Sequence, residues 1–187
     1  MRQLTSTRRS KLAAAVLCAC ASTVVVNAQQ ASGAAAPPDP PRVEFAFEFR
    51  VSLAPVVSLG ETPAGQRRYI PITGGVIVGP KLTGEILAGG WDYQLSLANG
   101  CSHLAADYFI RAADGTVIHV LNEGPSCNVQ GERSIFHPRF EAPKATHDWL
   151  NRGTFVATLE VEPAAPATSG QAPQSPRGIR LKIYQLK

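Results

Sequence analysis

The sequence predicts an all-β protein, built as a single antiparallel β-barrel of about nine or ten short strands with little helix. Apolar and polar residues alternate with a period of two in several segments, as in half-buried strands. Glycine and proline separate these segments, with 16 Gly and 15 Pro in 187 residues. Glycine pairs at 74–75 and 89–90 are typical of sharp bends in a curling sheet, which favours a barrel over a sandwich.

The first 28 residues have the layout of a secretory signal peptide. Four basic residues lie within the first 11 positions, and an apolar stretch of 15 residues follows at 12–26. We expect cleavage after Ala28. The apolar stretch is shorter than the roughly 20 residues that a membrane-spanning helix needs. We therefore expect a secreted or periplasmic protein with no membrane contact after cleavage; an uncleaved anchor or a lipoprotein attached through the 17–20 stretch are the alternatives.

Cleavage changes the charge balance of the chain. The full sequence has 18 basic and 14 acidic residues, which gives a formal charge of +4. Without the four basic residues of the signal peptide, each sign is represented by 14 residues. The remaining chain has no basic cluster longer than Arg67–Arg68. Nucleic-acid binding needs a basic face or stripe, so we exclude nucleic acid as a partner.

Cleavage also leaves two of the four cysteines, Cys101 and Cys127. Two cysteines in an exported protein generally pair, and this pair would stabilise the fold by roughly 3 kcal/mol. The alternative is a metal site formed by Cys101, His103 and Cys127, but thiolate zinc sites usually show paired spacings that this sequence lacks. We expect a disulfide and no metal site.

The folded domain is predicted at 42–187, after a flexible leader rich in Pro and Ala at 29–41. Its first strand covers 43–53, where apolar residues from Val43 to Leu53 alternate with polar or small ones. A short strand at 69–73 contains Pro71, which suits a sheet edge or a bend. Strands at 76–78, 82–87 and 91–98 are bounded by glycine pairs or by turn residues.

The second half of the domain continues the pattern. Strands at 103–112 and 116–122 are joined through Ala113-Asp114-Gly115, a clear hairpin signal. Further strands are predicted at 135–141, 154–161 and 179–183. One or two helical turns are predicted at 144–152, ended by Gly153. Residues 163–178 contain four prolines and no apolar period, so we expect a disordered hairpin insertion there.

Seven short motifs follow one another along this domain. They are YIPITGG at 69–75, Gly79-Pro80 with Leu82-x-Gly84, Gly89-Gly90-x-Asp92, Tyr108-x-x-Arg111 with Asp114-Gly115, Asn122-x-Gly124, PRFE at 138–141, and Trp149-Leu150-Asn151 leading to Phe155. Together they resemble domain-of-unknown-function family 3237, small uncharacterised proteins, over residues 43–187. The resemblance implies an antiparallel β-barrel and no settled activity. Because a few fungal relatives are associated with closing rings in small oxygenated natural products, it also implies a lumen large enough for a ligand.

Three residues are candidates for catalysis: Asp92, Arg139 and Glu141. Asp92, Gln94 and Ser96 share one face of a strand, which by default faces solvent. Asp92 is the exception, because the preceding glycine pair can aim its side chain at the barrel mouth. Arg139 and Glu141 are two residues apart, so they lie on one side of a strand. They form either a surface ion pair or a clamp for a carboxylate or enolate, with Glu141 as the base.

The predicted ligand contacts are Tyr108, Arg139 and Trp149, since aromatic side chains dominate small-molecule pockets. The two aromatic residues could equally belong to the core. The sequence therefore predicts a barrel that binds a small organic molecule in its lumen. The alternative is a cofactor-free lyase, isomerase or cyclase that acts on a small oxygenated organic compound by acid/base chemistry. No nucleotide-binding glycine pattern or nucleophile elbow occurs, so we expect no cofactor and no catalytic triad.

Overall fold

The computed structural model describes residues 39–127, 129–130, 133–162 and 178–187. Its elements are, in order, β1 (Val43–Leu53), β2 (Val57–Thr62), β3 (Gly65–Val78), β4 (Gly84–Ile86), β5 (Gly90–Ser96), β6 (Cys101–Ala112), β7 (Val117–Cys127), β8 (Ile135–Glu141), α1 (Trp149–Arg152), β9 (Phe155–Glu162) and β10 (Gly178–Leu186). The predicted signal peptide lies outside the described residues. So does the predicted insertion, except for Gly178, which begins β10.

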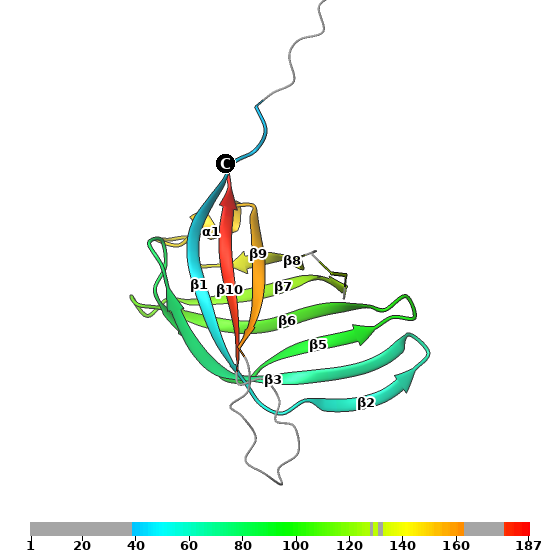
Figure 1. Ribbon diagram of the computed structural model, residues 1–187. Helices are drawn as coiled ribbons and strands as arrows, with labels where there is room; N and C mark the ends of the chain where they lie inside the picture. The colour runs from blue at the N-terminus through cyan, green and yellow to red at the C-terminus, as the bar shows by residue number, and fades with distance from the viewer. Residues whose placement is uncertain (1–38, 128, 131–132, 163–177) are drawn as a thin grey trace, which may run out of the picture. The chain divides into compact units, whose positions relative to one another are not determined.

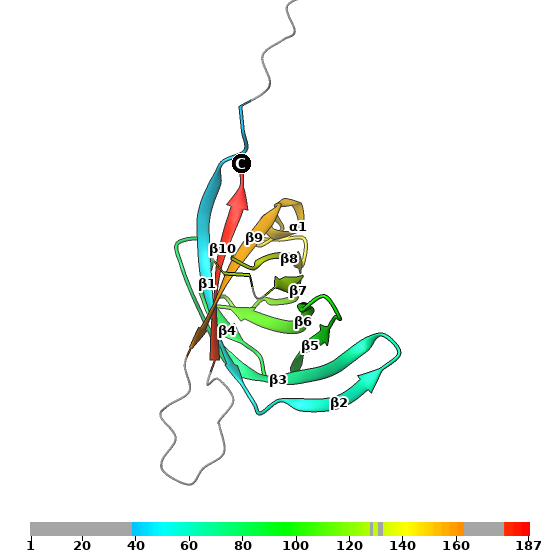
Figure 2. The ribbon, with the colours of Figure 1, turned by 45° about the vertical axis from the view of Figure 1, so that its right-hand side comes forward.

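Eight strands close into an antiparallel barrel in the order β1-β10-β9-β8-β7-β6-β4-β3, and β3 pairs back onto β1 (Figure 1). Two strands lie outside this ring. Strand β2 pairs with β3, and β5 pairs with both β3 and β6. Both views show β2, β3, β5 and β6 extending side by side away from β1, β9 and β10 (Figure 2). The prediction of a single antiparallel barrel with little helix is confirmed.

Strand β1 supplies the centre of the core. Phe47, Phe49 and Val51 are buried, as the alternation predicts. The pairing with β10 shifts between Phe45 and Phe47, so Phe45 is exposed and Ala46 is buried instead. The Phe47 and Phe49 rings lie 5.1 Å apart and belong to an aromatic cluster in the core that includes Tyr108 and Phe140.

Strand β3 is one strand of 14 residues where two shorter strands were predicted. Pro71 does not interrupt it: the residue pairs with Trp91 of β5, and its carbonyl accepts a hydrogen bond from the backbone of Ala54 at 2.9 Å. The predicted bend falls at Gly75, where φ is 153°. A Cβ atom there would collide with the carbonyl oxygen of Arg50, so glycine allows β3 to cross β1 closely.

The structure adds detail to the predicted fold at three places. Strand β2 was not predicted, because most of its residues are exposed and show no alternation. Of the one or two helical turns predicted at 144–152, one is present as α1, and it ends at Gly153 as predicted. Only Leu150 of that turn is buried, so no apolar stripe holds a longer helix. The strand predicted at 116–122 continues to Cys127.

Cys101 and Cys127 begin β6 and end β7, where they lie directly opposite each other. Their Cα atoms are 4.2 Å apart and their sulfur atoms are bonded. The predicted disulfide is therefore present in the structure. It joins the far ends of the hairpin whose turn, at Gly115, was also predicted.

Candidate functional site

A cavity of about 290 Å³ opens at the end of the barrel where β1 and β9 end and β10 begins. We call it the mouth cavity. Its apolar lining comes from Leu53, Val56, Ile70, Leu104, Leu159, Val161 and Ile179. Its polar lining comes from Arg68, Asp92, Gln94, Ser102 and Ser126. An apolar wall with a few convergent polar groups is the usual composition of a small-molecule site, and the volume is near the lower end of their range, roughly 300 Å³.

Three polar side chains form a hydrogen-bonded chain along this wall. Arg68 of β3 and Gln94 of β5 are paired in register, and Arg68 Nε donates to Gln94 Oε1 at 2.7 Å. Gln94 Nε2 donates to Asp92 Oδ2, also at 2.7 Å. Asp92 and Gln94 face the interior together because they are two residues apart in one strand. Each end of the Gln94 amide thus has a partner that suits it, which fixes its orientation.

Asp92 is an acid held inside the barrel wall. Its exposed fraction is 6%. Burial raises the pKa of its carboxyl group, while the hydrogen bond from Gln94 and the positive charge of Arg68 act in the lowering direction. No described residue donates a hydrogen bond to its other oxygen, Oδ1. A carboxyl group with a raised pKa and a free oxygen beside a cavity is suited to exchange a proton with a bound molecule.

Two further polar groups lie deeper in the barrel. Tyr108 and Asn122 are 1% and 4% exposed, and neither Tyr108 Oη nor Asn122 Oδ1 has a partner among the described residues. Asp92, Ala106 and Asn122 are paired in one row across β5, β6 and β7, and Tyr108 is the next inward residue after Ala106. Burial raises the pKa of the Tyr108 hydroxyl, and the charge of Asp92 adds to this effect. Polar groups therefore continue from the mouth cavity into the core.

The structure does not bring Arg139 and Glu141 to this cavity. They share one side of β8 as predicted, but Phe136 and Pro138 occupy its inward side. Arg139 Nη2 bonds Glu123 Oε1 at 2.9 Å, and the Glu141 side chain is 87% exposed. The expectation that this pair faces the lumen is corrected. Arg139 is part of a surface ion pair, with Glu123 rather than Glu141 as its partner.

The two aromatic residues predicted to contact a ligand, Tyr108 and Trp149, pack in the core instead. Trp149 lies in α1, where its ring is 5.8 Å from Phe155 and 6.5 Å from Phe47. Strand β9 begins beside α1 and ends at the mouth cavity, so Trp149 is at the opposite end of the barrel. Tyr108 packs edge-on against Phe49 at 6.0 Å. Of the predicted site residues, only Asp92 lines the mouth cavity.

Sequence reasoning missed Arg68 and Gln94. Gln94 was expected to face solvent together with the rest of its polar stripe, whereas it is 6% exposed and faces the interior. The first part of β3 was not predicted as a strand, so nothing paired Arg68 with Gln94. The polar stripe itself was the available signal, because a polar stripe on a barrel strand can also line a polar lumen.

In the part of the chain that the structure describes, no three His, Cys, Asp or Glu side chains gather closely enough to hold a metal ion. None of the helices within the described ranges has the length and apolar character needed to cross a membrane.

The closed antiparallel ring with a cavity at one end defines a small β-barrel protein. Residues 41–186 match the model of a family described as "Protein of unknown function (DUF3237)". The chain belongs to this family. The resemblance seen in the sequence motifs is therefore confirmed.

Relatives of known sequence or structure extend this result. The chain is 35% identical to a UPF0311 protein of Bradyrhizobium diazoefficiens over 130 residues, which cover 62% of this chain and 85% of the relative. It is similar to a crystal structure of a β-barrel-like protein from Acinetobacter baumannii, with a TM-score of 0.66, 27% identity, and coverage of 81% of this chain and 99% of the other. It is also 27% identical to a hydroalkoxylation enzyme of Penicillium herquei over 119 residues, covering 64% of this chain and 74% of the enzyme.

Proposed function

We propose that this chain is an exported protein that binds a small organic molecule in the mouth cavity. The observation that carries the proposal is the composition of the cavity: an apolar wall that leads to one buried acid, Asp92, whose Oδ1 is unused by the described residues. Burial of an apolar ligand surface contributes about 25 cal/mol per Å². The apolar wall thus supports affinity, and the polar groups support orientation.

Export is supported by two independent features of the chain. The first 28 residues have the charge and apolar pattern of a signal peptide. The disulfide between Cys101 and Cys127 is typical of proteins that fold in an oxidising compartment. We therefore place the binding function in the periplasm or outside the cell.

The binding proposal can be tested by native mass spectrometry of protein purified from its own host. We expect a small molecule to be retained by the unmodified protein and to be lost from Leu104→Trp and Leu159→Trp, which fill the cavity from β6 and β9. Val76→Trp is the matched control, since Val76 lies on the exposed outer face of β3. If the ligand is lost during purification, a thermal-shift screen with one- and two-ring organic compounds measures binding instead, as a rise in Tm. Equal binding by the filled and unfilled proteins would contradict the proposal.

A second candidate function is acid/base catalysis by Asp92 on the bound molecule. The raised pKa of this carboxyl group favours it, and so does the relative named as a hydroalkoxylation enzyme. In a hydroalkoxylation an O–H group adds across a carbon–carbon double bond, so oxygen loses one proton and carbon gains one. A carboxyl group that accepts the first proton and donates the second needs no other reactant.

The catalytic candidate is tested with a 2-prenylphenol, whose cyclised product has the same mass and is separated by gas chromatography. We expect cyclisation above the uncatalysed rate by the unmodified protein, and a loss of about 100-fold or more in Asp92→Asn. Binding of the phenol by Asp92→Asn, measured by calorimetry, separates lost chemistry from lost affinity. Cyclisation by Asp92→Asn at the unmodified rate would exclude Asp92 as the acid/base group.

A further inference from the structure

We infer that the ligand of the mouth cavity is an organic monocarboxylate, whose acid group pairs with Arg68 at the rim while its apolar body extends toward Asp92. This inference rests on the proposed binding function and names the chemical class of the ligand. It is carried by the lack of an anionic partner for Arg68 among the described residues and by the distribution of charge around the cavity.

The first observation is an arginine that is held in place but has no anionic partner. Arg68 Nε donates to Gln94 Oε1, which orients the guanidinium group at the cavity wall. Within the described ranges, Nη1 and Nη2 of Arg68 donate no hydrogen bond, and Arg68 forms no ion pair. The two free nitrogens form one edge of a planar fork that matches the geometry of a carboxylate.

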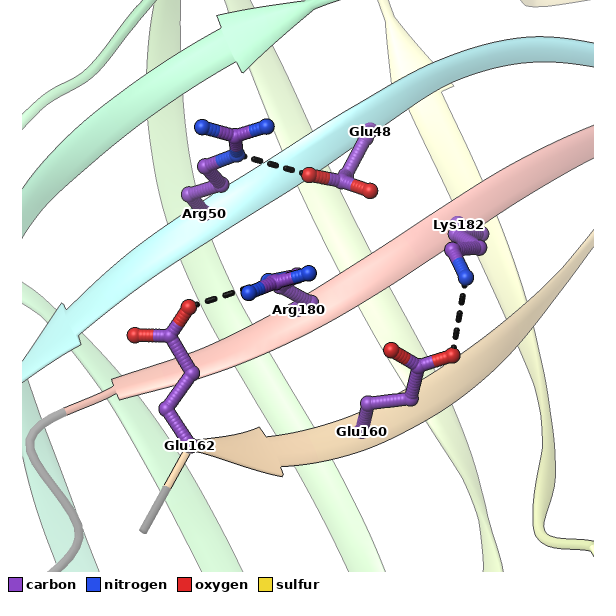
Figure 3. Close-up of polar contacts among 6 residues, drawn as sticks. All are labelled: Glu48, Arg50, Glu160, Glu162, Arg180 and Lys182. Carbon is purple, nitrogen blue, oxygen red and sulfur yellow. Dashed lines mark hydrogen bonds and ion pairs between the residues drawn. The ribbon is translucent and has the colours of Figure 1, made fainter. Parts of the chain in front are cut away.

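Three cations on the outer barrel wall are paired with acids instead. Across β1, β9 and β10, three cations each bond a neighbouring acid at 2.7 to 3.0 Å: Arg50 with Glu48, Arg180 with Glu162, and Lys182 with Glu160 (Figure 3). Those ion pairs are complete without any ligand. Arg68 is exposed and bonded through one nitrogen only, so it keeps the capacity to bind an anion.

The second observation is the placement of opposite charges in the cavity. Arg68 is at its exposed rim, whereas Asp92 is buried two residues beyond Gln94. The negative potential of an ionised Asp92 would repel a carboxylate from the inner end, so the acid group of the ligand is directed to the rim. The inner end suits a hydroxyl or carbonyl group that shares a proton with Asp92 Oδ1.

The same distribution favours a carboxylate over a phosphate. Arg68 is the one cationic side chain among the described residues that line the cavity, and seven lining residues are apolar. A phosphate dianion needs several charged or backbone donors around its oxygens. One guanidinium edge satisfies both oxygens of a carboxylate, and the apolar wall receives the remainder of the molecule.

Calorimetry with a matched series of ligands tests this inference. The probes are 3-phenylpropanoate, its methyl ester and its primary amide, which share an apolar body and differ in charge. We expect the purified protein to bind the carboxylate about tenfold more tightly than the ester or the amide. Arg68→Gln should remove this preference, and Arg68→Lys should keep part of it because the charge remains without the fork.

Arg67→Gln is the matched control. It removes the same charge from the neighbouring position of β3, whose side chain points to the other face of the sheet and does not line the cavity. We expect Arg67→Gln to keep the preference for the carboxylate. Loss of the preference in both variants would indicate a general effect of net charge and would overturn the role of Arg68.

Failure of the inference differs from failure of the proposed function. If carboxylate, ester and amide bind with equal Kd and Leu104→Trp abolishes binding of all three, the cavity binds small molecules but the carboxylate inference is overturned. If none of the three binds, or if Leu104→Trp and Leu159→Trp bind them as well as the unmodified protein does, both the binding function and the inference fail.

Discussion

Gln94 holds Asp92 by a single carboxylate oxygen, with 2.7 Å between Gln94 Nε2 and Asp92 Oδ2. The same amide accepts a hydrogen bond from Arg68, so the Gln94 side chain separates the positive charge of Arg68 from the Asp92 carboxyl group. This arrangement offsets part of the cost of burying a carboxylate without pairing it directly with a cation. The balance between burial and this support decides the protonation state of Asp92.

Replacing Asp92 by Asn is expected to stabilise the protein at neutral pH. A carboxyl group with a raised folded-state pKa binds its proton more tightly in the folded than in the unfolded chain. The contribution of Asp92 to stability is therefore greatest below its ordinary pKa of 3.8 and falls as pH rises through the folded-state value. Thermal unfolding of Asp92→Asn from pH 4 to 8 should show a higher Tm at pH 7 and a smaller fall with pH. Glu61→Gln, at an exposed position, should keep the fall; an unchanged pH profile in Asp92→Asn would contradict the prediction.

Tyr108→Phe is expected to raise the free energy of unfolding by about 1–2 kcal/mol. The substitution removes a buried hydroxyl that has no hydrogen-bond partner among the described residues and keeps the ring that packs on Phe49. Urea denaturation measures the change, and Tyr93→Phe provides a control at an exposed position of β5. A loss of stability in Tyr108→Phe would mean that the hydroxyl is satisfied in solution.

Loss of the disulfide is expected to lower the free energy of unfolding by about 3 kcal/mol, since it closes a 26-residue separation. The measurement is urea denaturation of the Cys101→Ser, Cys127→Ser double variant. Alkylation of the denatured, unreduced protein followed by peptide mass spectrometry checks the bond itself. Neither cysteine should be alkylated, and modification of both would rule the bond out.

Arg139→Ala and Glu141→Ala are expected to be nearly silent. Both side chains lie on the outer surface of β8, so each change should alter the free energy of unfolding by less than about 0.5 kcal/mol. Binding of 3-phenylpropanoate should also be unchanged. A tenfold loss of affinity in either variant would restore these residues to the site and would conflict with their position in the structure.

Much of the barrel was predictable because buried strands leave a period-two pattern. The alternation in β1, the hairpin at Gly115 and the pairing of Cys101 with Cys127 all depend on neighbours close in the chain or on pairwise chemistry. The pattern fails where burial does not alternate. Strand β2 is largely exposed on both sides, and the shift between Phe45 and Phe47 changes which residue faces inward.

The site was harder to predict because facing in or out depends on distant strands. Spacing correctly placed Arg139 and Glu141 on one side of β8, but only the packing of Phe136 in the core determines that this side is outward. The reverse applies to Gln94, whose polarity suggested solvent. Its burial depends on Arg68, which lies 26 residues earlier and pairs with it across the sheet.

The break between β4 and β5 has a consequence for how such a barrel can diversify. Both short strands pair with β3 and β6, but only β4 belongs to the closed ring, and β5 carries Asp92 and Gln94. Asp92 and Gln94 thus lie outside the ring of strands that carries the aromatic core, whereas Arg68 and most of the apolar lining lie on ring strands. Substitutions at Asp92 and Gln94 can therefore change which small molecule the cavity prefers, while the eight strands that close the barrel keep their arrangement.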